Sequence, residues 1–309
     1  EEDAGDPPVS QLGIFFMWFL AVLVIVVNIP VFIVTQQLKE TSQATKMTMF
    51  SLALSDMGFA IETIFRLSYF AYNGRYSFID DYICSIEGIV QSTLGGVSIM
   101  TIVYLCIDRV ITIKYPLHYP IYFTKKVVVC ILVSTWLYVT LVFTLSHLVI
   151  GMEIAMMRDA LLCGFVPEFQ SNLTLLIIIN GFALPVCIIL TCAIILYCIV
   201  YQQIKQIRAI ENASENASRT ESLVSHKRAI RTISCMVAGY YICWTPAMIL
   251  VWVWSYVYGT SYGPTADAVT GWLAFCNSIY NPLVYLPTMR EYREIFRRIF
   301  VPKIFASHT

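Results

Sequence analysis

Five polar side chains interrupt long apolar stretches of the sequence and could together bind a cation. They are Asp56, Ser98, Asn277, Ser278 and Asn281. Polar groups inside membrane-crossing segments are costly and usually face the interior of a helix bundle. One carboxylate beside several neutral oxygens suits a small hard cation such as sodium. A water-bridged packing network is the alternative, and we favour the cation because an unpaired Asp56 would be costly.

Three charged residues in the same kind of stretch could form an ionic cluster. Glu62 and Arg66 are four residues apart, so on a helix they share a face and can pair. Glu87 lies one helical turn after Cys84 and is expected to face the segment that carries the other two. The charges could neutralise one another and hold helices together. Alternatively, two carboxylates against one guanidinium could leave negative charge for a cationic or hydrogen-bond-donating ligand.

No catalytic site is recognisable in the sequence. It has no glycine-rich phosphate loop, no zinc-spaced cluster and no nucleophile beside a base, and its four histidines are scattered. We therefore predict that the protein is not an enzyme, and we expect no nucleic-acid partner. A channel or transporter would need an aqueous path or paired half-helix repeats, and neither is evident.

Composition places these residues in a membrane protein. Hydrophobic residues make up 58% of the 309 and charged residues 13%, against about half and a quarter in soluble domains. Seven apolar spans between residues 13 and 288 are each long enough to cross a bilayer as a helix. They cover residues 13–37, 45–72, 82–114, 126–150, 172–204, 227–258 and 267–288. The predicted fold is an all-α membrane protein, a seven-transmembrane helix bundle.

The basic residues predict the orientation of this bundle. Apart from Arg66, Arg75 and Arg158, the lysines and arginines gather at one set of alternate span ends, which the positive-inside rule makes cytoplasmic. Residues 1–12 are then an extracellular N-terminus. Residues 205–226 form a polar cytoplasmic loop that is either flexible or helix-extending, and 301–309 form a cytoplasmic tail. We expect a multi-pass protein of the plasma membrane.

Residues 289–300 alternate charged and apolar side chains at helical spacing. This pattern predicts a short amphipathic eighth helix that lies on the membrane surface and contacts the lipid bilayer.

Two of the ten cysteines are candidates for a disulfide bond. Most of the others lie inside apolar runs, where cysteine acts as a small hydrophobic residue. Cys84 and Cys163 lie at the borders of such runs and form the candidate pair. Asn172 begins an Asn-Leu-Thr sequon on the predicted outer side and is a candidate for glycosylation.

Four short motifs, taken with their order and spacing, resemble those of rhodopsin-like (class A) G-protein-coupled receptors. They are Asp56 within LALSD, Asp108-Arg109-Val110, Cys243-Trp244-Thr245-Pro246 and Asn281-Pro282-Leu283-Val284-Tyr285. The resemblance implies a heterotrimeric G protein as partner, contacted through Asp108, Arg109, Leu117 and Tyr119. The span-six position where many receptors hold Arg109 with an acid has none near His226. We therefore expect basal signalling.

Within that class, the segments 74–78, 84–88 and 93–96 resemble opsins. Glu87 falls where many vertebrate opsins carry the counterion of the retinal Schiff base. Opsins attach retinal to a lysine six residues before the Asn of the Asn-Pro motif, and Phe275 stands at that position. No covalent cofactor is therefore expected. Monoamine receptors carry an aspartate where Gln91 stands, so an ordinary monoamine pocket is not expected either.

These residues predict a ligand pocket in the outer half of the bundle, with Trp244 as its floor beside the kink at Pro246. The predicted ligand contacts are Arg66, Glu87, Gln91, Trp244, Met248, Trp272 and Phe275. The leading hypothesis is a receptor for a small diffusible ligand that activates a G protein. The alternative is an opsin-like light sensor that holds retinal non-covalently.

Overall fold

The structure is a computed structural model that describes residues 11–73, 78–157, 162–211, 217–260 and 263–301. Within these residues, seven long helical segments follow one another: α1 (Gln11–Gln37), α2 (Gln43–Asn73), α3 (Phe78–Lys114), α5 (Lys125–Leu148), α6 with η1 and α7 (Asn172–Ile178, Ile179–Ala183, Leu184–Glu211), α8 with η2 and α9 (Ala217–Ala247, Met248–Val253, Trp254–Tyr258), and α10 (Pro264–Thr288). The shorter elements are α4 (Tyr119–Tyr122), β1 (Ile154–Met157), β2 (Leu162–Phe165) and α11 (Arg290–Phe300).

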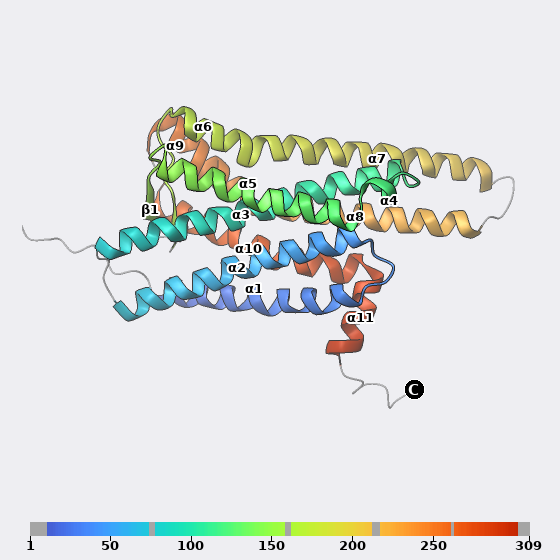
Figure 1. The fold of residues 1–309 in the computed structure, drawn as a ribbon, viewed down its shortest axis with the longest axis horizontal. Coiled ribbons are helices and arrows are strands. Elements are labelled where there is room, and N and C mark those ends of the chain that lie inside the picture. Colours follow the sequence, from blue (N-terminus) through green and yellow to red (C-terminus); the bar gives the residue numbers. More distant parts are fainter. Residues whose placement is uncertain (1–10, 74–77, 158–161, 212–216, 261–262, 302–309) are drawn as a thin grey trace, which may run out of the picture.

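The long helices lie side by side along one axis (Figure 1). The antiparallel strands β1 and β2 lie at one end, which we call the disulfide end because it also holds the bond between Cys84 and Cys163. At the other end α7 and α8 extend past the rest of the bundle, and α11 turns across its axis (Figure 1). We call this the Arg109 end. The predicted all-α helix bundle is confirmed.

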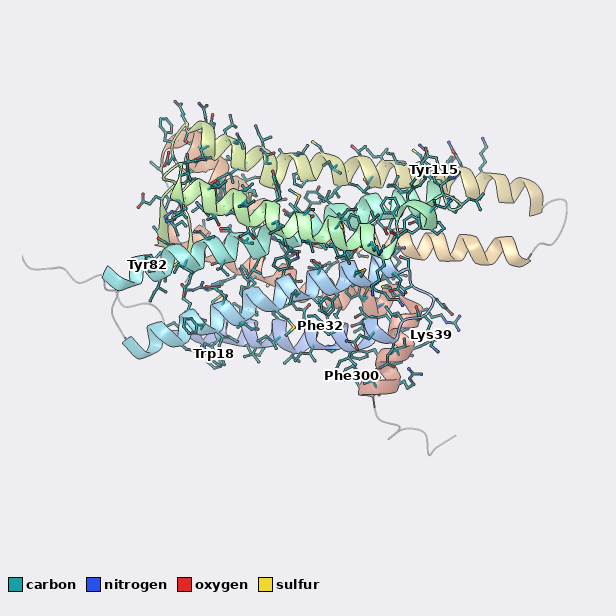
Figure 2. All side chains as sticks on the ribbon, in the orientation of Figure 1. Trp18, Phe32, Lys39, Tyr82, Tyr115 and Phe300 are labelled. Carbon is teal, nitrogen blue, oxygen red and sulfur yellow. A yellow bond between two sulfur atoms is a disulfide. The ribbon has the colours of Figure 1, made fainter. Side chains whose placement is uncertain are left out.

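The outer surface of the bundle suits a bilayer. Within the described residues, six helices are long and apolar enough to cross a membrane, and α10, with 25 residues, matches the seventh predicted span. Leu137, Leu141 and Ile194 are 60%, 56% and 63% exposed. Figure 2 shows side chains pointing outward from the bundle, with Trp18 on the outside of α1. In hydrocarbon, these apolar groups need no protein partner.

Helix covers most of the segment predicted as the 205–226 loop. α7 continues to Glu211 and α8 begins at Ala217, while residues 212–216 lie outside the described part. Of the two alternatives for this segment, flexible or helix-extending, the described residues follow the second. The predicted terminal segments 1–12 and 301–309 lie almost entirely outside the described residues.

Two helices widen into a π-turn close to a proline. η1 ends two residues before Pro185, and η2 begins two residues after Pro246. Proline has no backbone N–H and its ring crowds the preceding turn, which favours a local rearrangement of the helix, although α1 and α10 continue through Pro30 and Pro282. A π-turn is one local rearrangement that keeps backbone groups paired inside a membrane.

Small residues allow the helices to approach closely in two places. A Cβ on Gly239 of α8 would overlap the ring of Tyr280 on α10. A Cβ on Gly96 of α3 would lie 2.7 Å from a methyl carbon of Val139 on α5. Close contact at small residues is how helices pack in lipid, where water does not drive them together.

The amphipathic helix α11 is fastened to the connection between α1 and α2. Its Tyr292 and Ile295 are buried against the bundle. The Glu291 carboxylate accepts hydrogen bonds from the backbone amides of Lys39, Glu40 (2.9 Å) and Thr41 (3.1 Å) and from the Thr41 hydroxyl (2.9 Å). Burial alone would raise the pKa of Glu291, but these donors outweigh it and lower the pKa.

Glu291→Ala should therefore lower the free energy of unfolding at pH 7 by about 1 kcal/mol, because the carboxylate is largely solvated. A lowered folded pKa means that this contribution is full above the pKa of a free glutamate, about 4.3, and is lost as the pH falls through the folded value. Thermal denaturation of the purified protein at pH 7 and at lower pH measures it. Glu294→Ala, three residues away and 61% exposed, is the control and should change little. Equal loss in both variants would contradict the role of Glu291.

Candidate functional site

A buried carboxylate in the middle of the bundle joins three helices. Asp56 on α2 is 2% exposed. Its carboxylate accepts hydrogen bonds from the hydroxyls of Ser278 (2.9 Å) and Ser98 (3.5 Å) and from the Asn281 amide (3.2 Å). The structure thus brings α2, α3 and α10 together at one carboxyl group, and the predicted polar residues on these helices lie close to one another.

The same constellation contains acceptor oxygens that have no hydrogen-bond partner among the described residues. Asn277 and Asn281 are 2% and 1% exposed, and their side-chain oxygens have no hydrogen-bond partner among the described residues. Such buried acceptors are costly unless something pairs with them. A carboxylate, two hydroxyls and two amide oxygens form a donor set that fits a small hard cation.

A second ionic cluster lies toward the disulfide end. Arg66 on α2 is 1% exposed and pairs with Glu62 at 2.7 Å. The same guanidinium nitrogen donates to Gln91 of α3 at 3.3 Å. Glu87 is also buried, and its Oε1 has no hydrogen-bond partner among the described residues. The cluster therefore links α2 to α3 and leaves one carboxylate incompletely satisfied.

A cavity of about 330 Å³ lies between α3, α5, α8 and the two π-turns. Its wall is mostly apolar, with a few polar groups from Gln91, Ser92, Asn180 and Thr270. Trp244 lines it against α3, where a Cβ on Gly95 would lie 3.5 Å from the indole. Small-molecule sites have this character, an apolar wall with a few polar groups that orient the ligand.

Three of the seven predicted ligand contacts line this cavity, and four do not. Gln91, Trp244 and Met248 line it. Arg66 and Glu87 lie beside it in the ionic cluster, with Gln91 as the link. Trp272 contacts the ring of Phe16 on α1, with 5.1 Å between ring centroids.

Phe275, at the position of the opsin lysine, is buried in an apolar cluster. It is 1% exposed and packs with Met17 and Leu20 of α1 and Ala60 of α2. Its ring centroid lies 5.0 Å from that of Phe59. Phe275 therefore packs α10 against α1 and α2, and it contributes no polar group to the cavity.

The strand pair closes the disulfide end of the cavity. The predicted bond between Cys84 and Cys163 is present and joins α3 to β2, with the two Cα atoms 5.4 Å apart. Cys163 and Phe165 line the cavity. Asn172, the candidate for glycosylation, is exposed at the start of α6.

Sequence reasoning missed the polar group that span five contributes. Asn180 lies in η1 and lines the cavity, and its amide donates to the carbonyl of Leu176 at 2.8 Å. The signal was the Asn-Gly pair inside an apolar span shortly before Pro185. The η2 residues Met248 and Trp252 line the facing wall. Both π-turns thus shape the same cavity.

At the Arg109 end, Asp108 holds its neighbours in place. Its carboxylate lies 3.8 Å from the Arg109 guanidinium and accepts a hydrogen bond from the Tyr119 hydroxyl at 2.5 Å. Burial, together with this bond to Asp108, raises the pKa of Tyr119 to about 12. Arg109 also donates to the Thr45 hydroxyl of α2. Leu117, between α3 and α4, is 83% exposed.

Comparisons with known proteins agree with this geometry. Residues 27–285 match the family described as 7 transmembrane receptor (rhodopsin family). A red-sensitive opsin of Oryzias latipes is 24% identical over 94% of this chain and 80% of its own length, and a rhodopsin of Sargocentron tiere is 27% identical over 90% and 79%. An alpha-1A adrenergic receptor of Oryzias latipes is 24% identical over 70% of this chain and 51% of its own length. The crystal structure of squid rhodopsin shares the fold, with a TM-score of 0.80, 18% identity and coverage of 93% of this chain and 79% of that one.

Arg66→Met should destabilise the bundle by about 3–5 kcal/mol, because it leaves buried carboxylates without their cation. Arg66→Met combined with Glu62→Gln should recover most of that loss. Thermal denaturation and surface expression measure both. Arg290→Met is the matched control, since Arg290 and Glu294 form the same i,i+4 pair at 2.6 Å with both side chains more than 60% exposed, and it should change little. A double variant no more stable than Arg66→Met would refute the pairing.

Proposed function

The chain belongs to the rhodopsin family of seven-transmembrane receptors, and from this premise we propose that it binds a small diffusible ligand in the cavity between α3, α5 and α8. Binding there activates a heterotrimeric G protein at the Arg109 end. The observation that carries the proposal is the position of Trp244. This residue lines the cavity and lies two residues before Pro246, which is followed by the π-turn η2. A ligand against Trp244 thus contacts the helix that must move to open the Arg109 end.

The proposed orientation places the N-terminus outside the cell and the Arg109 end in the cytoplasm, in the plasma membrane. The clustering of lysine and arginine at that end supports this arrangement. The disulfide end then faces outward, in keeping with a bond that persists in oxidising surroundings, and Asn172 becomes accessible for glycosylation.

The proposed activation step releases Arg109 from its resting contacts. Arg109 forms an ion pair with Asp108 on its own helix, α3, and donates a hydrogen bond to Thr45 on α2. In the sequence, the span-six position where many receptors hold this arginine with an acid has none near His226. Separation of α8 would let Arg109 and the exposed Leu117 contact the G protein. The lack of an acid at this sequence position supports basal signalling.

A light sensor that holds retinal non-covalently is the second candidate. The apolar wall of the cavity and the opsins among the relatives favour it, whereas Phe275 removes the amine that a covalent link needs. Purified protein mixed with retinal decides between the two. A visible absorbance band that depends on the cavity residue Trp244 would favour the light sensor, and a hit from a ligand library read by G-protein dissociation would favour the diffusible ligand.

We predict that cells expressing the protein show G-protein dissociation above mock-transfected cells without added ligand. Leu117→Ala should lower that signal about tenfold, as removal of a buried leucine contact costs roughly 1.5–3 kcal/mol. Leu148→Ala is the control, since Leu148 is also exposed (69%) but lies at the disulfide end of α5. Surface expression is measured in parallel. Equal signals in expressing and mock cells would refute basal activity, and an unchanged signal with Leu117→Ala would refute its role.

We further propose that the Asp56 constellation holds a sodium ion, with oxygens from Ser98, Asn277, Ser278 and Asn281. A bound cation would supply fixed positive charge beside the carboxylate. Sodium in place of potassium should raise the thermal stability of the purified protein, by roughly 1 kcal/mol when sodium is several-fold above its Kd. Asp56→Asn should abolish the difference between the two salts, and Asp267→Asn, at the far end of α10, should keep it. Equal stability in both salts would refute the site.

A further inference from the structure

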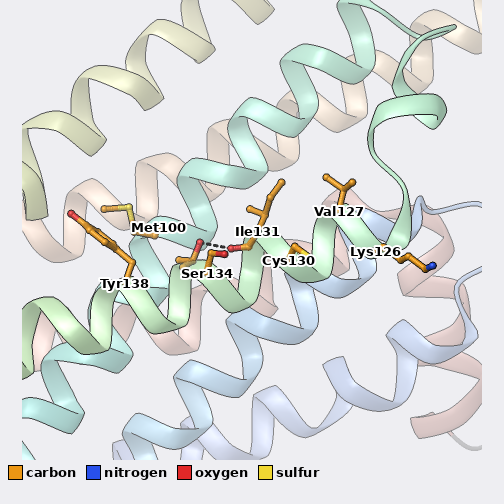
Figure 3. A pocket seen from close by; sticks show the side chains of 8 residues that line it. Met100, Lys126, Val127, Cys130, Ile131, Ser134 and Tyr138 are labelled. Carbon is orange, nitrogen blue, oxygen red and sulfur yellow. Dashed lines mark hydrogen bonds between the residues drawn. The ribbon is translucent and has the colours of Figure 1, made fainter.

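A second hollow lies on the outside of the bundle. It is an open groove of about 560 Å³ between α3 and α5. Met100 of α3 contributes to its wall, and the rest comes from one face of α5 (Figure 3). Cys130, Ser134 and Tyr138 of α5 line it and are exposed at the surface of the bundle. The groove therefore opens toward the space that lipid fills.

The groove follows the axis of α5. Lys126, Cys130, Ser134 and Tyr138 succeed one another at intervals of four residues, which places them along one helix face. From the first to the last, an α-helix rises about 18 Å. One leaflet of a hydrocarbon core is roughly 15 Å thick. The groove thus has the length of a single acyl chain in one leaflet.

A positive charge stands at one end of this groove. Lys126 is the second residue of α5 and is exposed (Figure 3). The side chain of Thr124 makes no capping hydrogen bond, so it does not cover the first turn of the helix. An ammonium group beside a helix amino end complements a phosphate at headgroup depth.

The other end of the groove meets the ligand cavity. Met100 and Tyr138 line both hollows, and Figure 3 shows them together at the end remote from Lys126. A chain that reaches these two side chains touches a wall that the cavity shares.

We propose that the groove binds one anionic phospholipid from the leaflet at the Arg109 end. Lys126 holds its phosphate, and one acyl chain runs along Cys130 and Ser134 to Met100 and Tyr138. The site does not depend on the identity of the receptor's ligand. Its occupancy can be measured on the purified full chain whether or not signalling is detected.

Native mass spectrometry of the purified protein, titrated with phosphatidylglycerol and with phosphatidylcholine of the same chains, tests the proposal. One phosphatidylglycerol should bind more tightly than the rest. Lys126→Gln should weaken that binding about fivefold, the effect of roughly 1 kcal/mol for one basic residue near anionic lipid. Lys125→Gln is the matched control, because Lys125 is its exposed neighbour but does not line the groove, and it should change affinity less than twofold.

A second pair of variants tests the path of the chain. Ser134→Trp should block the groove and abolish the tight binding event, while Val133→Trp, on an exposed neighbour outside the groove, should leave it. Thermal denaturation verifies folding of both. Equal effects of Lys125→Gln and Lys126→Gln would overturn the proposal in favour of diffuse attraction. Equal affinity for the two lipids, or binding that survives Ser134→Trp in folded protein, would also overturn it.

Discussion

One buried carboxylate constrains how three helices of the bundle pack together. Asp56 lies between the ligand cavity and the Arg109 end, and it draws donors from α3 and α10. A carboxylate in a low-dielectric interior is costly without partners, so Ser98, Ser278 and Asn281 are constrained to face it. Since α3 and α10 meet at the same group, neither helix can rotate or slide without changing those hydrogen bonds. The two ends of the molecule are therefore mechanically linked through its centre.

The second buried charged group is the Arg66 guanidinium, opposite in sign to Asp56. It lies on α2, whereas opsins carry their buried cation on the seventh span. The family resemblance places a cation on the seventh span, whereas this chain has Phe275 there and buries the guanidinium of Arg66 on α2. Arg66 is paired within its own helix by Glu62 and reaches α3 through Gln91. The cavity is thus left with amide and hydroxyl groups rather than a formal charge on its wall. Shape and a few hydrogen bonds would then select its ligand.

Much of this architecture follows from the sequence, because lipid restricts a chain to helices of predictable length. The seven spans, the pair of Cys84 and Cys163 and the constellation around Asp56 were all predicted. The cavity wall was predicted less well. Helical periodicity cannot place Phe275 or Trp272, since both the cavity and the contact with α1 are apolar, and side-chain polarity does not distinguish them. Asn180 shares a helix face with Leu176 and Ile177 and was missed because those neighbours are apolar.

The π-turns determine what deletion of a single residue would do to these two helices. Each accommodates one residue more than an α-helix of the same rise, so side chains beyond it are rotated by about 100° relative to an uninterrupted helix. This rotation sets α6 apart from α7 across η1, and α8 apart from α9 across η2. Removal of a single residue from either turn could leave the backbone fully hydrogen-bonded and still re-aim every side chain on one half. The two halves of these helices are therefore in separate rotational registers, each free to diversify against its own neighbours.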